Sequence, residues 1–414
     1  MHTATAGTTV PRSFREVWLV SAGHGLTHWY TATFYILLPL IGKELGLSYT
    51  EIGLIMTIQH LAGAISNVPG GILVDTVGRK GYLMAASLFW VGFPYALMSL
   101  THNFWMLLVC VTLVGVGNNI WHPAAIPFLA HRYPERKGLV LSFHGMGGNC
   151  GEAIAPFVIG ALLAVYSWRT VVVLNVVPGI AMAVVILAMM GALTMERHGD
   201  GVNAAAKSST GTRDYLRGFA GLLRNKPLML VSVSAAFRTL TQSGLLTFLP
   251  VYLAYELDYS PFAVGICMTI VQVAGFLAAP FAGHLSDTMG RKRVVVSSMI
   301  LTGVTIAGMA LAGRTVWFVV FIALVGFFLY AMRPVLQAWA VECTPKQLAG
   351  AGVGLQFGIT AVGASVGPAL AGIISDASDI YIGFYFLAGT IVAANVLMLL
   401  MPAENGARPA PAQA

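Results

Sequence analysis

Long uninterrupted apolar segments restrict the fold of this 414-residue sequence more than any other feature. Hydrophobic residues make up 57% of the chain and charged residues only 9%, against about 25% charged in soluble domains. The apolar runs are roughly 20 residues or longer, which is enough to cross a hydrocarbon core about 30 Å thick as a helix. No segment alternates as the strands of a membrane barrel do. The sequence therefore predicts an all-α membrane protein with about twelve spans, at residues 17–40, 51–74, 81–100, 104–130, 138–165, 169–194, 227–254, 261–285, 294–313, 316–341, 347–375 and 380–401.

The distribution of positive charge predicts how the chain faces the membrane, because cytoplasmic loops hold the excess of Lys and Arg. With the N-terminus inside, the inner segments hold 18 of the 23 basic residues. Only Lys43, Arg169 and Arg314 lie outside, and Arg238 and Arg333 fall within spans. Both termini are therefore expected to be cytoplasmic. Anionic lipid headgroups account for the net charge of +7, and no nucleic-acid partner is needed.

Composition also excludes some alternatives. The four cysteines lie within apolar runs and form no CxxC pair, so neither a disulfide framework nor a zinc ribbon is indicated. The first apolar run is long enough to remain a span, and we expect no cleaved signal. The chain has no GxxxxGK[ST] loop to bind ATP, so a transporter of this kind would be driven by an ion gradient, and we expect no cofactor.

Two halves of the sequence repeat each other. GGILVDTVGRK at 70–80 has a near copy, GHLSDTMGRKR, at 283–293, and GxxxAPxxxG at 151–160 recurs as GxxxGPxxxG at 363–372. Equivalent residues are 212 positions apart in both cases, as Asp75 is from Asp287 and Gly151 is from Gly363. The repeat predicts two six-helix bundles, at 1–194 and 227–414, joined by a polar cytoplasmic linker at 195–226.

The duplicated GxxxDxxGRK pattern resembles the signature of the major facilitator superfamily. Three further stretches, GHGLTHWY, GVGNNIWHP and FHGMGGNCGEAIAP, resemble fosmidomycin-resistance-type exporters within it. Thr76 and Thr288 replace the basic residue that often follows the motif Asp. The resemblance implies a monomeric transporter of the bacterial inner membrane that works by alternating access and exports a small toxic compound in exchange for protons.

The repeated motifs are the expected moving parts. The carboxylate in each copy of the first motif can contact helix N-termini and basic side chains of the other half, and the second motif places small residues and proline where helices cross closely. A simple positive-inside turn and ordinary helix packing are the alternatives. The expected gating residues are Gly71, Asp75, Gly78, Arg79, Gly151, Pro156, Gly283, Asp287, Gly290, Arg291, Gly363 and Pro368.

Polar residues within the spans predict a central water-filled site, because an ionisable side chain in mid-bilayer costs at least about 2.5 kcal/mol. Helical spacing groups them on common faces. The expected substrate-binding residues are His24, His28, Gln59, Asn118, His122, Arg238, Gln242, Tyr330, Arg333 and Gln337.

Arginine binds carboxylate, phosphate or phosphonate well and carries protons poorly, so we expect an anionic or zwitterionic substrate. Glu152 is the one carboxylate near the middle of a span, which makes it the expected proton carrier, with His144 or His122 second. Two alternatives remain open here. Glu152 can instead neutralise one arginine as a structural pair, and each histidine can be an ordinary interhelical hydrogen-bonding group.

Three functional classes follow. The first is a proton-coupled exporter of a small drug-like or anionic compound, with uptake of an organic anion as its alternative. The second is an intramembrane metalloenzyme, because His24 and His28 have an i, i+4 spacing that can hold zinc. It leaves the duplicated motifs unexplained, so we expect no enzyme and no metal site. The third is a sensor that binds without transporting. The partners expected are the substrate, protons and lipid.

Overall fold

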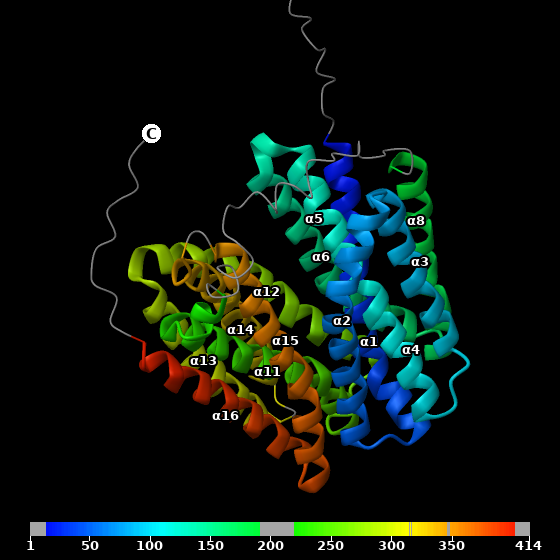
Figure 1. Ribbon diagram of the computed structural model, residues 1–414. Coiled ribbons are helices and arrows are strands. Elements are labelled where there is room, and N and C mark those ends of the chain that lie inside the picture. The colour runs from blue at the N-terminus through cyan, green and yellow to red at the C-terminus, as the bar shows by residue number, and fades with distance from the viewer. Residues whose placement is uncertain (1–13, 191–218, 314, 316, 346–347, 402–414) are drawn as a thin grey trace, which may run out of the picture.

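The computed structural model describes residues 14–190, 219–313, 315, 317–345 and 348–401, and within them the chain is helical, with no strand. The expected linker at 195–226 and the terminal segments lie largely outside the described residues. The N-terminal half, blue to green in Figure 1, contains α1 (Arg15–Leu45), α2 (Tyr49–Val77), α3 (Lys80–Met98), α4 (Phe104–Asn118), α5 (Trp121–Arg132), η1 (Pro134–Arg136), α6 (Lys137–Leu163), α7 (Trp168–Leu174) and α8 (Val176–Met190).

The C-terminal half, green to red in Figure 1, repeats this arrangement. It contains α11 (Lys226–Tyr255), α12 (Pro261–Met289), α13 (Arg291–Ala312), α14 (Trp317–Glu342), α15 (Ala349–Ala377) and α16 (Ile380–Leu399). If α4 with α5 and α7 with α8 each count as one span, the described helices form six spans in each half. The predicted fold class is therefore confirmed.

In the described part of the chain, nine segments are long and apolar enough to cross a membrane by length and composition alone. The helices α1, α2 and α11 are longer than most of these segments but less apolar, and they are not among the nine. Each carries polar side chains that line a cavity between the halves, including Thr31, His60 and Arg238. A span that faces water on one side is less apolar than one that faces only lipid and protein.

Two predicted spans are broken helices. Between α4 and α5, Pro123 has no N–H to donate, and the carbonyl of Gly117 accepts a hydrogen bond from Ser87 Oγ at 2.7 Å. Between α7 and α8, Pro178 has the same effect, and Asn175 Oδ1 accepts from Trp29 Nε1 at 2.6 Å. Side chains of neighbouring helices thus bond polar groups at both breaks, as membrane helices require.

The GxxxAPxxxG stretch at 151–160 and its copy at 363–372 pack helices closely, as predicted. A side chain at Gly151 of α6 would overlap the backbone of Gly25 on α1, and one at Gly363 of α15 would overlap the carbonyl of Ala236 on α11. The pairs α1–α6 and α11–α15 are equivalent in the repeat and are among the most extensive helix contacts in the structure. Small residues allow this approach where lipid provides no hydrophobic drive for helix association. Pro156 and Pro368 lie inside the same two helices.

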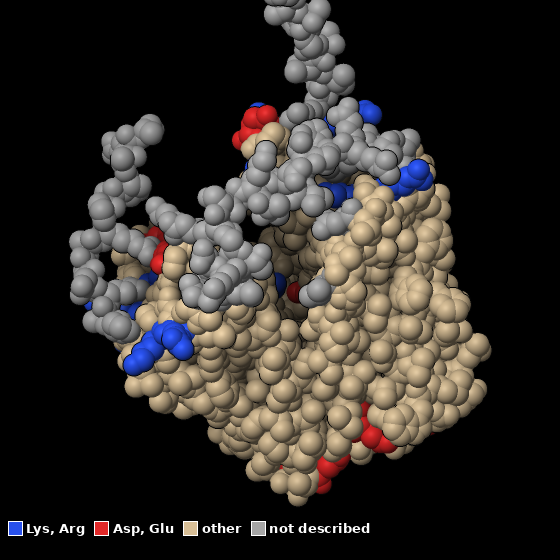
Figure 2. All heavy atoms as spheres, viewed as in Figure 1, with Lys and Arg blue, Asp and Glu red and all other residues tan. Residues whose placement is uncertain are grey.

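The two halves are joined at one end of the molecule. There α2 packs against α15 and α6 against α12, and Gly53 and Gly265 have no room for a side chain beside the carbonyls of the opposite half. Asp376 at the end of α15 accepts hydrogen bonds from the N–H groups of Tyr49 and Thr50, at 3.0 and 2.7 Å. Figure 2 shows a hollow between the halves that opens at the other end, with basic and acidic atoms visible inside it. The molecule is therefore closed at one end and open at the other.

The GxxxDTxGRK motifs form helix ends rather than loops. Helices α2 and α12 continue to Val77 and Met289, a few residues past the predicted span ends at 74 and 285. The turns are short, consisting of Gly78 and Arg79 in the first copy and Gly290 in the second, and both glycines have positive φ, at 69° and 92°, which favours glycine. A side chain at Gly71 or Gly283 would contact nothing. The close approach expected at these two glycines is therefore not made in this conformation.

Candidate functional site

A polar cavity with a volume of about 280 Å³ lies between the two halves. Helices α1, α2 and α6 of the first half and α11, α12, α14 and α15 of the second contribute to it. Five of the residues predicted to bind substrate or protons line it, namely Glu152, Arg238, Gln242, Arg333 and Gln337. These five residues therefore surround one cavity, while their roles stay predictions.

The two intramembrane arginines make no ion pair in the described part of the chain. Arg238 is only 4% exposed, its Nε donates to the carbonyl of Leu329 at 3.0 Å, and its guanidinium carbon lies 5.7 Å from the ring centroid of Tyr330. Its Nη2 has no hydrogen-bond partner among the described residues. Arg333 is exposed and lines the same cavity. Two positive side chains therefore face the cavity without a bonded counter-ion, an arrangement suited to an anion.

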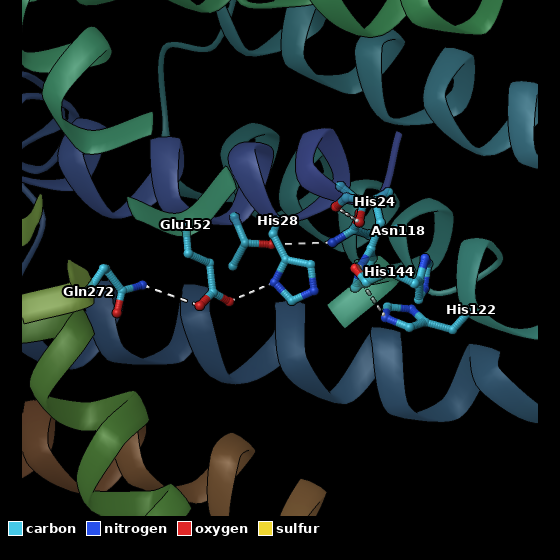
Figure 3. A network of polar contacts seen from close by, with 9 residues as sticks. His24, His28, Asn118, His122, His144, Glu152 and Gln272 are labelled. Atoms are coloured by element: carbon cyan, nitrogen blue, oxygen red, sulfur yellow. Dashed lines mark hydrogen bonds and ion pairs between the residues drawn. The ribbon is translucent and has the colours of Figure 1, made fainter. Parts of the chain in front are cut away.

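Glu152 pairs with a histidine and not with an arginine. Its Oε1 lies 2.6 Å from His28 Nδ1, and its Oε2 accepts a hydrogen bond from Gln272 Nε2 at 3.4 Å (Figure 3). His28 belongs to α1 of the first half, whereas Gln272 belongs to α12 of the second. The carboxylate thus links the two halves next to the cavity, and the structural Glu–Arg pair considered above is not formed.

Four histidines cluster beside Glu152 in the first half (Figure 3). His24 Nδ1 lies 2.6 Å from the carbonyl oxygen of His144, and its Nε2 lies 3.1 Å from His122 Nε2. The rings of His24 and His144 are stacked, with centroids 3.9 Å apart. Neither ring nitrogen of His144 has a partner among the described residues. His24, His28 and His122 can also each direct one nitrogen to a shared metal ion, because these atoms lie within 4.8 Å of one another.

A second cavity of about 220 Å³ adjoins the first and shares Thr31, His60 and Ala364 with it. Gln59 and Asn118, both predicted to bind substrate, line this second cavity. Asn118 Nδ2 donates to Thr31 Oγ1 at 3.2 Å. The predicted residues are therefore divided among three neighbouring places, which are the two cavities and the histidine cluster. Tyr330 is buried beside Arg238. The role of each residue stays a prediction.

Two glutamines of the main cavity, Gln272 and Gln356, were missed from the sequence. His60, one of the polar residues of the second predicted span, lines both cavities. The repeat contains the signal that could have found both glutamines, since a shift of 212 places Gln272 at the position of His60 and Gln356 at that of His144. In a duplicated bundle, equivalent positions face the same central axis.

The two copies of the GxxxDTxGRK motif lie at the α2–α3 and α12–α13 hairpins. The second copy makes its ion pairs within its own half. Asp287 Oδ1 and Glu342 Oε1 lie 2.7 and 3.1 Å from Arg291 Nη2, and both acids belong to the C-terminal half. In the first copy, Arg79 lies over the ring of Tyr82 at 5.7 Å. Contacts of these hairpins with the opposite half, expected from the sequence, would belong to a conformation closed at this end.

Comparison with known proteins places the chain among transporters. The sequence profile of the Major Facilitator Superfamily matches residues 20–252 and 231–414. The chain is 26% identical to a hexuronate transporter of Bacillus subtilis over 373 residues, which cover 85% of each chain. It is 24% identical to a phosphoglycerate transporter protein of Salmonella typhimurium over 382 residues, covering 87% of this chain and 82% of that protein. It is 25% identical to the fosmidomycin resistance protein of Escherichia coli over 417 residues, covering 96% of each.

Solved structures share the fold. A bacterial homologue of the human lysosomal transporter Spinster, in an inward-facing and occupied conformation, has a TM-score of 0.76 at 15% identity, covering 95% of this chain and 97% of that one. The nucleoside transporter NupG has a TM-score of 0.74 at 11% identity, covering 93% and 98%. These relatives and neighbours are transport and resistance proteins, so the expectation that the chain is not an enzyme is confirmed.

Proposed function

Because this chain belongs to the Major Facilitator Superfamily, we propose that it is a proton-coupled transporter of a small organic anion that works by alternating access. The family resemblance stated from the duplicated motif is confirmed, and the fosmidomycin resistance protein is among the relatives. Substrate, coupling ion and direction are the proposed parts. The observation that carries them is a single cavity in which two arginines without a bonded counter-ion face a carboxylate bonded to histidine.

The arginines support an anionic substrate. A buried guanidinium with an unpartnered N–H is costly unless a ligand or water completes its hydrogen bonds, and a carboxylate, phosphate or phosphonate matches its planar donors. Arg333 and the amides of Gln242 and Gln337 line the same cavity and can hold the other end of a polar substrate. Two of the named relatives, which transport hexuronate and phosphoglycerate, have names that describe anions.

The bonds of Glu152 support proton coupling. The carboxylate lies beside a cavity open to solvent, and it bonds to one residue of each half. Protonation removes its charge and changes both bonds, which can favour one relative position of the halves over another. Binding of a proton and rocking of the halves would then be coupled, as alternating access requires.

The open end of the hollow is assigned to the cytoplasm. Figure 2 shows acidic but no basic atoms at the closed end of the visible face, and the positive-inside rule places the basic end in the cytoplasm. In this assignment both termini are cytoplasmic, the structure is inward-open, and the membrane is the bacterial inner membrane. We propose that a monomer, with lipid around it, is the working unit.

Export in exchange for protons is the first direction proposed, because the fosmidomycin resistance protein matches a larger share of both chains than the other two relatives do. Uptake together with protons is the second. It is favoured by the arginine-lined cavity and by the names of the hexuronate and phosphoglycerate transporters.

The test is a flux assay in proteoliposomes with an imposed pH gradient. The panel contains glucuronate, 3-phosphoglycerate, fosmidomycin and, as a control, the cation ethidium. An antiporter accumulates its anion in the more acidic compartment and a symporter in the more alkaline one, whichever way the protein is inserted. Flux that does not depend on the pH gradient would contradict proton coupling. A protein that transports ethidium but none of the three anions would contradict the substrate class.

A further inference from the structure

Three histidines of the N-terminal half converge at one point beside the main cavity. His24 and His28 are one turn apart on α1, and His122 follows the break between α4 and α5. One ring nitrogen of each lies within 4.8 Å of the others. The closest pair, His24 Nε2 and His122 Nε2, is 3.1 Å apart. The break before α5 contributes to this arrangement, because it directs His122 toward α1.

The other ring nitrogens of the two α1 histidines are already bonded. His24 Nδ1 must donate to the carbonyl of His144, since a carbonyl oxygen only accepts, and this leaves Nε2 with its lone pair in the neutral ring. His28 Nδ1 is bonded to the Glu152 carboxylate, which leaves its Nε2 free in the same way. Histidines that bind metals typically donate their second N–H to a backbone carbonyl or a carboxylate, and both arrangements are present here.

The spacing also fits a transition-metal ion. With metal–nitrogen bonds of about 2.0–2.1 Å, two ligand nitrogens of a tetrahedral site lie about 3.3 Å apart. The pair at 3.1 Å is close to this value, and the remaining nitrogens need to move by about 1.5 Å at most, which side-chain rotation can supply. Three neutral imidazoles favour zinc, nickel, cobalt or copper over magnesium or calcium, which prefer oxygen ligands.

We propose that His24, His28 and His122 form a binding site for a divalent transition-metal ion, with Glu152 and the carbonyl of His144 orienting two of the ligands. This reverses the expectation from the sequence that the chain has no metal site, but it adds no enzymatic activity. The fourth coordination position is open to water or a ligand, because His28 and His122 are only partly buried. The inference does not rest on the proposed function.

The site belongs to one half only. All three ligands come from α1 and α5, and both orienting groups come from α6. Rocking of the halves therefore leaves the ligand set intact, so metal should bind equally well whichever end of the molecule is open. A site formed between the halves would instead be lost or gained during transport.

The experiment uses the full chain, purified in detergent without a polyhistidine tag and stripped of metal with a chelator. Cobalt(II) is titrated while the visible absorption of tetrahedral cobalt is recorded, and zinc is then added in competition. We expect one cobalt per chain, displaced by zinc. His24→Ala and His122→Ala should each weaken binding at least 100-fold, and Glu152→Gln about 10-fold to 100-fold through the loss of an orienting bond. His284→Ala, which changes an exposed histidine of α12, is the matched control and should bind as the parent does.

A second variant distinguishes the loss of a metal ligand from misfolding of the protein. His122→Cys keeps a metal ligand at this position and should retain cobalt binding while adding a thiolate charge-transfer band in the near ultraviolet. Each variant is first checked for a thermal unfolding midpoint near that of the metal-free parent. No binding of cobalt or zinc to the parent at millimolar concentration would overturn the proposal. Binding that survives in His24→Ala and His122→Ala, or a His122→Cys protein without the new band, would place the metal elsewhere and overturn it as well.

Discussion

The Nδ1 atom of His28 lies 2.6 Å from Oε1 of Glu152, and these two residues join α1 to α6 beside the main cavity. The second carboxylate oxygen accepts a hydrogen bond from Gln272 of the opposite half. Glu152 is therefore bonded on one side to the histidine cluster and on the other to the C-terminal half. A proton that binds here changes contacts in both halves at once.

Glu152→Gln should abolish transport driven by a pH gradient and leave exchange of substrate between the two sides of the membrane. The amide keeps the size and can still bond to its neighbours, but it does not bind and release a proton. The measurement compares flux under a pH gradient with equilibrium exchange of labelled substrate. If flux driven by the gradient persists unchanged in this variant, Glu152 is not the proton carrier.

Arg238→Lys and Arg333→Lys should each weaken binding of the transported anion. A hydrogen bond to a charged group is worth about 1.5–3 kcal/mol, which corresponds to roughly a 10-fold to 100-fold rise in Kd. Lysine keeps the charge but lacks the planar pair of donors. Binding is measured by calorimetry in detergent, and Arg293→Lys at an exposed position of α13 is the control. Unchanged affinity in both cavity variants would remove the arginines from the binding site.

Asp376→Asn should weaken the closed end of the molecule. The carboxylate accepts two N–H groups at the start of α2, where the helix dipole also favours negative charge. The site is exposed, so the cost is about 1 kcal/mol. We expect a larger fraction of molecules with the opposite end closed. Spin labels on Gly71→Cys and Gly283→Cys, positions where a side chain meets nothing, would report this as shorter distances between the hairpins.

Asp379→Asn is the matched control for that measurement. Asp379 caps α16 by accepting from the N–H of Ile382 at 2.8 Å, and both residues belong to the C-terminal half. Its loss should destabilise the end of one helix without changing the distance between the hairpins. Equal distance distributions for Asp376→Asn and the parent would show that Asp376 does not hold the closed end together.

A covalent tether between the same two hairpins should stop transport. The native cysteines are first replaced, and Gly71→Cys and Gly283→Cys are joined by a bifunctional reagent. The bridge limits the separation of the hairpins, whereas alternating access requires them to approach and part. Substrate flux should fall to background after cross-linking and return when a cleavable bridge is reduced. Full flux through the tethered protein would rule out the rocking mechanism.

The ion pair of Glu44, just beyond the span predicted at 17–40, should give the fold an acid-sensitive contribution to stability. Trp168 Nε1 donates to its Oε2, and Arg169 donates to its Oε1 at 2.6 Å. The hydrogen bond from Trp168, and then those from Arg169, lower the pKa of this carboxyl below its usual value. The stabilisation is therefore complete above the unfolded pKa of about 4.3 and is lost as the pH falls below it.

Glu44→Gln tests this contribution. The variant should have a lower thermal unfolding midpoint than the parent at pH 7, and the gap should shrink as the pH is lowered through 4.3 toward the lowered pKa. A gap that stays constant over this range would show that the charge of Glu44 contributes nothing.

The sequence by itself determined the helical membrane fold, its duplication and the identity of most polar groups in the cavity. Apolar runs of span length leave helices as the only available structure, and a repeat of 212 positions makes two equivalent bundles. Spacing along one helix also placed His24 and His28 on a common face, because side chains four positions apart point the same way.

Only the tertiary structure decided which of these groups meet. Glu152 bonds to His28 and Gln272 and to neither arginine, and His122 reaches His24 through a break in the helix that the hydrophobic pattern does not reveal. The hydrophobic pattern fixes which face of each helix is polar, but contacts between helices far apart in sequence depend on how closely their backbones pack. At Gly25 and Gly151 the packing depends on the surfaces of both α1 and α6, so neither segment of the sequence predicts it alone.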